Sequence, residues 1–280
     1  MREAIAFALY LPGLEMTLAA KLYSPATGER QMLFEHLECL APGDLLVLDR
    51  GYPSRWLIAH LTLRGIPFCI RADDSGFSAV KAFLRSTLPE TVVALRAADA
   101  VDCADYECAP TPTTVRLVRV VTPNGRVHAS ITSLLDATAF PAEGFADLNH
   151  SRWRIEEAFK RLKRLKHRMA LENTSGLSWL AAQQDFGAKV LADNLRALAV
   201  LEATALSNTP EQYKLNRTYA FAHLKRCLPR WLLAFLPSGQ EVLAAFEKLV
   251  RNLIRFVPGA TNPSPVHAKT HRKHAYKSTC

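Results

Sequence analysis

A strand–helix–strand pattern is visible in the first third of the chain. The run DLLVLD at residues 44–49 is apolar and has turn-forming residues on both sides, which is typical of a buried strand. Residues 53–64 have the periodicity of a helix, and PFCIRA at 67–72 has the composition of the next strand. Neighbouring strands joined through a helix pair in parallel, so we expect an α/β sheet with Asp49 at the carboxyl end of one strand.

Further strands are expected on either side of this pattern. The segments 3–10 and 14–22 are short apolar runs separated by the turn sequence LPG, and a helix is expected at 28–40. Between residues 90 and 133 apolar and polar residues alternate. The clearest part, TTVRLVRVV followed by PNG and RVHASITSL, predicts an antiparallel hairpin. We therefore expect a β-rich insertion in this region.

The remainder of the chain has the pattern of helices. Long helices are expected at about 145–168 and 177–205, and shorter ones near 217–228 and 239–255. The last residues are polar and basic and have no core pattern, so we expect a disordered tail from residue 259.

The net charge of the chain indicates which class of molecule it binds. The formal net charge is +9 and the pI is about 9.4, which favours a polyanion such as nucleic acid or an anionic membrane surface. No apolar run approaches the roughly 20 residues of a spanning helix, so we expect a soluble protein without a membrane partner. The six cysteines contain no CxxC pair, which indicates a reducing compartment, and Cys103 and Cys108 are expected to be ordinary thiols.

A basic segment, NHSRWRIEEAFKRLK, begins at Asn149 and contains two adjacent acids. On a helical wheel an apolar stripe through Ile155 is expected to face the core, and Arg152, Glu156 and Lys163 lie together along its flank. One interpretation is a solvated basic helix in which Glu156 forms ion pairs within the helix. The other is an acid that binds a divalent metal ion, surrounded by bases that hold nucleic-acid phosphates.

This segment resembles the signature of bacterial DDE transposases of the insertion-sequence-four type. That signature is Tyr, two residues, Arg, three residues, Glu, six residues and Lys, and its spacing matches Arg152, Glu156 and Lys163. The stretch DRGYPS is similar to the segment around the second catalytic aspartate of the family, which assigns that role to Asp49. The resemblance extends from about residue 3 to residue 205.

The resemblance implies a ribonuclease H-like fold, in which a mixed sheet with helices is interrupted by a β-rich insertion and followed by a helical C-terminal region. In such proteins three carboxylates hold two Mg²⁺ ions, which promote DNA strand cleavage and strand transfer at the ends of an insertion sequence. The implied boundaries are a partial core at 1–89, the insertion at 90–135, the glutamate helix and end of the core at 136–205, a helical region at 206–258 and the tail at 259–280.

The same resemblance implies the site residues and partners. Asp49 and Glu156 are the expected catalytic residues and metal ligands. The expected partners are double-stranded DNA at transposon ends and target, a second copy of the chain or a full-length transposase, in the nucleoid of a bacterial cytoplasm. Packing against neighbouring elements is an equal alternative for Tyr52 and Trp153. The expected DNA-binding residues are Arg50, Tyr52, Arg152, Trp153, Lys160 and Lys163.

Two departures from the family pattern affect the expected activity. Asn149 takes the place of the signature tyrosine, so a contact near DNA is expected to be altered. The first catalytic aspartate belongs on a strand before the point where this chain starts. We therefore expect a copy truncated at its N-terminus, with an incomplete two-metal site and impaired catalysis. The alternatives are a non-catalytic DNA-binding or dimerising fragment that competes with full-length transposase, and a basic structural or RNA-binding protein in which Glu156 only forms ion pairs.

Overall fold

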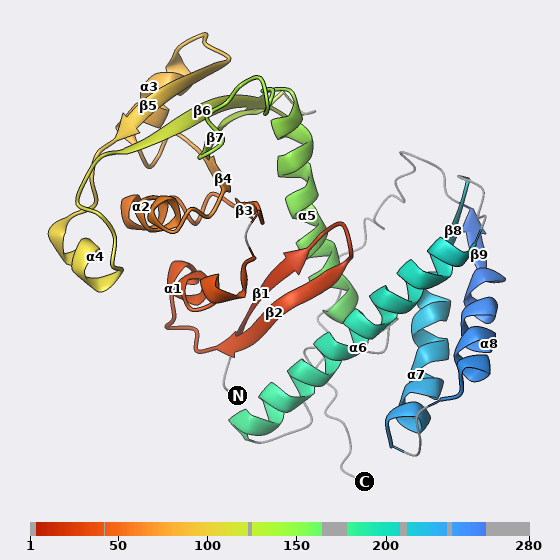
Figure 1. Ribbon diagram of the computed structural model, residues 1–280. Coiled ribbons are helices and arrows are strands. Elements are labelled where there is room, and N and C mark those ends of the chain that lie inside the picture. Colours follow the sequence, from red (N-terminus) through yellow and green to blue (C-terminus); the bar gives the residue numbers. More distant parts are fainter. Residues whose placement is uncertain are drawn as a thin grey trace, which may run out of the picture. The chain divides into compact units, whose positions relative to one another are not determined.

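The computed structural model describes residues 4–41, 43–122, 125–163, 178–207, 212–233 and 237–255 (Figure 1). The expected tail at 259–280 lies outside these ranges. The chain divides into two compact units. The first consists of Met1–Phe7 and Tyr23–Glu156, and the second of Ala8–Leu22 and Glu157–Cys280.

A five-stranded mixed sheet forms the centre of the first unit, with strand order β3-β4-β7-β6-β5 (Figure 1). The expected parallel pair is confirmed, because β3 runs parallel to β4 and Val47 lies opposite Cys69. Ser54 caps the connecting helix α2 by accepting a hydrogen bond from the backbone N–H of Leu57 at 3.3 Å. The bounds are β3 Leu46–Leu48, α2 Arg55–Leu63, β4 Phe68–Ala72, β5 Glu90–Leu95, β6 Thr113–Val121 and β7 Val127–Thr132.

The expected hairpin is also confirmed, since β6 and β7 pair antiparallel with Val118 opposite Ser130. Strand β7 in turn pairs antiparallel with β4, so β5, β6 and β7 extend the same sheet as the parallel pair. The region between β5 and β6 contains a short helix that the alternation did not indicate, α4 (Ala100–Asp105).

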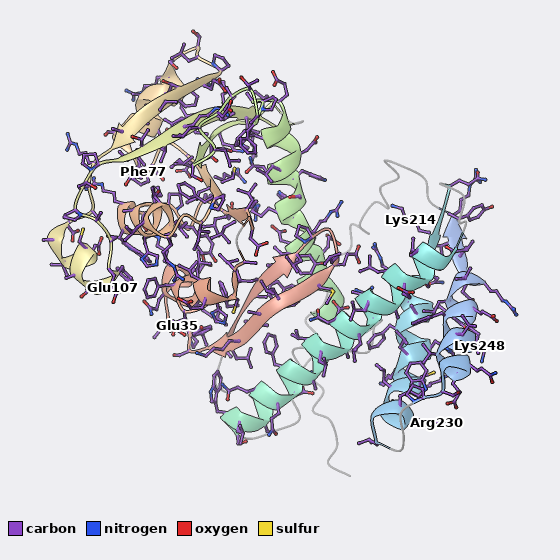
Figure 2. All side chains as sticks on the ribbon, in the orientation of Figure 1. Glu35, Phe77, Glu107, Lys214, Arg230 and Lys248 are labelled. Atoms are coloured by element: carbon purple, nitrogen blue, oxygen red, sulfur yellow. The ribbon has the colours of Figure 1, made fainter. Side chains whose placement is uncertain are left out.

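Both faces of this sheet are covered. On one face Cys69, Val118 and Val120 pack with Phe145 of helix α5 (Gly144–Lys163). On the other face α2 and helix α3 (Ser78–Arg85) contact β6, and side chains fill the space around α2 (Figure 2). The alternation of side chains along each strand produces these two faces.

The predicted helix at 28–40 is broken into two short pieces, α1 (Glu29–Phe34) and a 3-10 helix at Leu37–Cys39. The two predicted N-terminal strands are confirmed as a pair, β1 (Ile5–Leu11) and β2 (Met16–Tyr23). In the turn between them Glu15 adopts a positive φ of 56°.

Besides the end of α5, the described part of the second unit contains the helices α6 (Trp179–Leu206), α7 (Arg217–Leu233) and α8 (Gly239–Val250). Their core includes Ala203, Leu224 and Leu249. The helix predicted to end at residue 255 ends at Val250, where a short strand follows. This strand, β9 (Leu253–Arg255), pairs antiparallel with β8 (Tyr213–Leu215). No helix among the described residues is long and apolar enough to span a membrane.

The turn of the β1–β2 hairpin is attached to α6. Asn194 accepts a hydrogen bond from the backbone N–H of Thr17 and donates one to its carbonyl oxygen, both at 2.8 Å. Glu15 forms an ion pair with Arg217 and lies 3.9 Å from the buried Arg196. These ionic contacts hold the carboxylate of Glu15, whose left-handed backbone is unfavourable for a residue with a side chain.

Candidate active site

Asp49 is the first residue after β3 and lies between two arginines. Its Oδ2 atom is 3.4 Å from Nη1 of Arg152, and its Oδ1 atom is 3.9 Å from Nη1 of Arg71. Arg71 belongs to β4, where the preceding residue, Ile70, lies opposite Leu48. The parallel register of β3 and β4 thus brings Arg71 beside the aspartate that ends the neighbouring strand.

Glu156 approaches the same arginine from α5. Its Oε1 atom lies 3.7 Å from Nη1 of Arg152, one helical turn earlier. Two oxygens that lie 3.4 and 3.7 Å from one nitrogen are at most 7.1 Å apart, the sum of these distances. The structure therefore brings together the two acids that the sequence singled out, and their catalytic roles remain predictions.

The loop after Asp49 is held by backbone hydrogen bonds. The N–H of Tyr52 donates to the carbonyl oxygen of Asp49 at 3.1 Å, and Nε of Arg30 donates to the carbonyl oxygen of Gly51 at 3.2 Å. A Cβ atom at Gly51 would lie 2.9 Å from Oε2 of Glu29, so this position leaves no room for a side chain unless Glu29 moves. The glycine of DRGYPS thus lies beside the carboxylate of Glu29 on α1, and a side chain here would require that carboxylate to shift.

Helix α5 is anchored to the sheet by a polar residue. Asn149 is buried, and its Nδ2 donates to Oγ of Ser130 at 2.9 Å and to the carbonyl oxygen of Phe145 at 2.8 Å. Ile155 of the predicted core stripe is half-buried, and the side chains of α5 that contact the sheet are those of Phe145, Asn149 and Arg152. Hydrogen bonds and ion pairs to the strands offset the burial of these polar groups. The side chains of Leu162 and Met169 lie outside the part of the chain that the structure describes, so the stripe remains a prediction.

His128 is a residue of this site that sequence reasoning missed. It is buried on β7, two residues before Ser130 and therefore on the same face of the sheet. Burial, followed by the positive charges of Arg71 and Arg152, lowers the pKa of His128 to about 4, while Asp49 opposes this shift. The alternation in RVHASITS could have placed His128 on the face of Ser130, although not its neighbours on other elements.

Several buried polar atoms in this layer make no hydrogen bond within the described structure. They are Oδ1 of Asp49, Oδ1 of Asn149 and both ring nitrogens of His128. Buried polar groups are usually paired, so such a group of atoms indicates a place for water or for a bound ion.

The remaining predicted residues have separate surroundings. Arg50 is exposed, and Tyr52 is half-buried, where burial and the charges of Glu29 and Asp49 raise its pKa to about 12. The side chain of Trp153 is exposed, with its ring centroid 5.7 Å from Cζ of Arg152.

Lys160 contacts neither acid of the pair in the described structure. Lys160 is exposed, and its Nζ lies 2.7 Å from Oε1 of Glu157. Lys163 ends α5, and its side chain lies outside the part of the chain that the structure describes. The contacts of Arg152 with Asp49 and Glu156 thus distinguish it from Lys160.

The acid pair fits a hard divalent cation in part. Mg²⁺ is commonly bound by one or two carboxylates, with water and substrate phosphate as the other ligands. Asp49 and Glu156 supply such carboxylates, and Oδ1 of Asp49 is a buried acceptor without a hydrogen bond. Among the described residues no group of three His, Cys, Asp or Glu side chains is placed to hold a metal ion. The site therefore offers two protein ligands.

Comparison with known families gives a match over most of the chain. A family model described as a transposase DDE domain matches residues 15–195, which is more than half of the chain and includes both Asp49 and Glu156. No curated protein matches the chain.

Proposed function

This chain belongs to the transposase DDE domain family, and on that premise we propose that it binds double-stranded DNA and acts on its phosphodiester backbone with a divalent metal ion. The observation that carries the proposal is the convergence of Asp49 and Glu156 on one nitrogen of Arg152. A relationship to the insertion-sequence-four type and a ribonuclease H-like core belong to the same proposal. The spacing of Arg152, Glu156 and Lys163 and the parallel pair β3–β4 support them.

Some residues of the site would bind the metal ion and others would bind the DNA substrate. Asp49 and Glu156 would supply carboxylate oxygens to the ion, which when bound activates a water or a DNA 3′-hydroxyl and stabilises the leaving oxygen. Arg152 and Arg71 would hold a phosphate next to these acids, since guanidinium groups donate two parallel hydrogen bonds to phosphate. Exposed Lys160 and Trp153 would contact the DNA on either side.

We propose weak rather than strong cleavage. A site that positions two ions for in-line attack needs more ligands than the two carboxylates that meet in the described structure. The alternative is a DNA-binding protein without catalytic activity, which the net charge of +9 favours independently of the acids. The two proposals share DNA binding and differ in metal-dependent cleavage.

A plasmid assay separates them. Supercoiled plasmid is incubated with the purified chain in Mg²⁺ or Mn²⁺, and nicking is compared for wild type, Asp49→Asn and Glu156→Gln. The matched control is Glu157→Gln, because Glu157 is the adjacent acid, is exposed and pairs with Lys160. We expect slow nicking that both site variants abolish and the control retains.

DNA affinity is measured in parallel by fluorescence anisotropy across a salt series. The logarithm of affinity should fall linearly with the logarithm of salt concentration, by about 0.9 per phosphate contact. Salt-sensitive binding without nicking supports the non-catalytic alternative. Absence of DNA binding, or nicking that persists in both site variants, contradicts the proposed site.

A further inference from the structure

Arg152 occupies the space between the two acids that are proposed to bind metal. Its Nη1 atom is 3.4 Å from Asp49 and 3.7 Å from Glu156, so one nitrogen contacts both carboxylates. The side chain of Arg152 is 12% exposed, compared with 39% for Asp49 and 40% for Glu156. Arg152 is therefore the more buried partner of the three, and its side chain retains some exposure to solvent.

The four charged groups are already balanced. Asp49 and Glu156 contribute two negative charges, and Arg71 and Arg152 contribute two positive charges within 3.9 Å of them. A divalent cation added to this set has to displace a guanidinium or remain close to it, and like charges at such distances repel each other. The charge balance between the two acids and the two arginines therefore opposes metal binding until a further anion is present.

A DNA phosphate is the anion that would relieve this opposition. Arginine binds phosphate through paired, charge-assisted hydrogen bonds, and these compete with its contacts to carboxylates. The distances from Nη1 of Arg152 to the two acids, 3.4 and 3.7 Å, exceed those of charge-assisted hydrogen bonds. A phosphate that binds the guanidinium with better geometry can therefore replace the acids as its partner. Arg71 contacts Asp49 alone of the two acids, at 3.9 Å. Arg152 is thus the arginine that both acids share.

We propose that Arg152 is an internal counter-ion that competes with the divalent metal ion for Asp49 and Glu156, and that DNA removes this competition by binding the guanidinium. This inference rests on the proposed function. It makes metal and DNA binding cooperative, and by linkage each ligand raises the affinity for the other by the same factor. The chain would therefore load its metal ion only when DNA is in place.

Mn²⁺ binding tests the inference without any need for cleavage. The full chain is titrated with Mn²⁺, and free Mn²⁺ is followed by electron paramagnetic resonance, with and without a saturating double-stranded oligonucleotide. The double variant Asp49→Asn with Glu156→Gln gives the background of ions held by DNA itself. For wild type we expect about tenfold tighter Mn²⁺ binding with DNA than without it, within the usual range of such couplings.

The variant Arg152→Gln removes the competing charge. We expect it to bind Mn²⁺ about tenfold more tightly than wild type in the absence of DNA, and to lose most of the enhancement by DNA. Arg154→Gln is the matched control, because Arg154 is an exposed arginine of the same helix and its change removes the same charge. It should behave as wild type. Circular dichroism checks that each variant is folded, and the wild-type comparison with and without DNA does not depend on Arg152→Gln.

The outcomes distinguish the two proposals. Equal Mn²⁺ affinity with and without DNA in wild type overturns the counter-ion inference and leaves the metal site standing. Unchanged or weaker Mn²⁺ binding by folded Arg152→Gln overturns it as well. Mn²⁺ binding that never exceeds the background of the acid double variant removes the metal site, and with it the proposed catalytic function.

Discussion

Asn149 of α5 donates a hydrogen bond from Nδ2 to Oγ of Ser130 on β7, at 2.9 Å. The same Nδ2 atom donates to the carbonyl oxygen of Phe145 one turn earlier, so it links the sheet to the helix backbone. Glu156 lies on the same helix two turns after Asn149. The hydrogen bond between Asn149 and Ser130 therefore helps to position α5, and with it Glu156, relative to the sheet.

Replacing Asn149 with Ala should destabilise the protein. Loss of the amide leaves the buried Ser130 without this partner, and the expected fall in the free energy of unfolding is roughly 1–3 kcal/mol. Urea denaturation measures the change. His150→Ala is the control, since His150 is the exposed neighbour on the same helix and should cost less than about 0.5 kcal/mol. Equal effects of the two changes would contradict the anchoring role.

Arg116 should be the most sensitive basic residue of the sheet. It is 1% exposed, forms an ion pair with Glu90, and donates from Nη1 to the carbonyl oxygens of Phe140 at 2.7 Å and Leu134 at 3.3 Å. Arg116→Met leaves these acceptors unpaired, and we expect a loss of roughly 3–5 kcal/mol in the free energy of unfolding.

Two further variants isolate the ion pair of Arg116. Arg126→Met changes an exposed arginine at the end of the β6–β7 turn and should have little effect. Adding Glu90→Gln to Arg116→Met should cost less than the sum of the two single changes, because the partners interact. Strict additivity in thermal or urea unfolding would show that the pair contributes no coupling.

Local sequence patterns were sufficient for the main elements of the first unit. The parallel strands β3 and β4 and the hairpin β6–β7 have apolar runs with clear turn residues, and all four were predicted. The pairing of β8 with β9 was not, because each strand has three residues and is defined by its distant partner. Helix α4 was missed because its region was interpreted as strand.

Only those site residues that lie within a local sequence motif could be predicted. The spacing around Glu156 and the stretch after Asp49 are local, so both acids were singled out. Arg71 and His128 were not singled out, because the pairing register of β4 and β7 with their neighbours places them in this layer. The helical wheel placed Arg152 at the flank of an apolar stripe, whereas polar contacts with the strands turned that flank toward the sheet.

His128 should make the protein less stable in mild acid. Its pKa is lowered from 6.5 to about 4 in the folded protein, mainly by burial, so an unfolded chain takes up a proton that the folded protein resists. This contribution to stability is fully present above pH 6.5 and is lost as the pH falls from 6.5 toward 4. The loss attributable to His128 should be at most roughly 2 kcal/mol at pH 5.

Urea denaturation at pH 7.5 and pH 5 measures this effect. His128→Asn should reduce the difference in the free energy of unfolding between the two pH values. Exposed His150→Asn should leave the difference as in wild type. Identical pH dependence of wild type and His128→Asn would mean that the buried histidine is not the group responsible.

Cys103 and Cys108 should form a disulfide under a thiol oxidant such as diamide. Their Sγ atoms are 3.6 Å apart, although the sequence suggested unrelated thiols. Burial, followed by the contact with Cys103, raises the pKa of Cys108 to about 11, so the more accessible Cys103 should react first. Peptide mass spectrometry would detect a linkage that has lost two hydrogens. Crosslinking that instead joins Cys103 to exposed Cys39 would contradict the pairing.

The charge balance among Asp49, Arg71, Arg152 and Glu156 also bears on how related sequences can diverge. A substitution that removes the carboxylate at position 49 leaves two guanidinium groups facing each other across the place it filled, since both lie within 3.9 Å of it. Selection on stability alone would then favour loss of one arginine. In related sequences that have lost one of these charges, the four positions should therefore change in pairs, an acid together with a base, and the loss of an acid should come first.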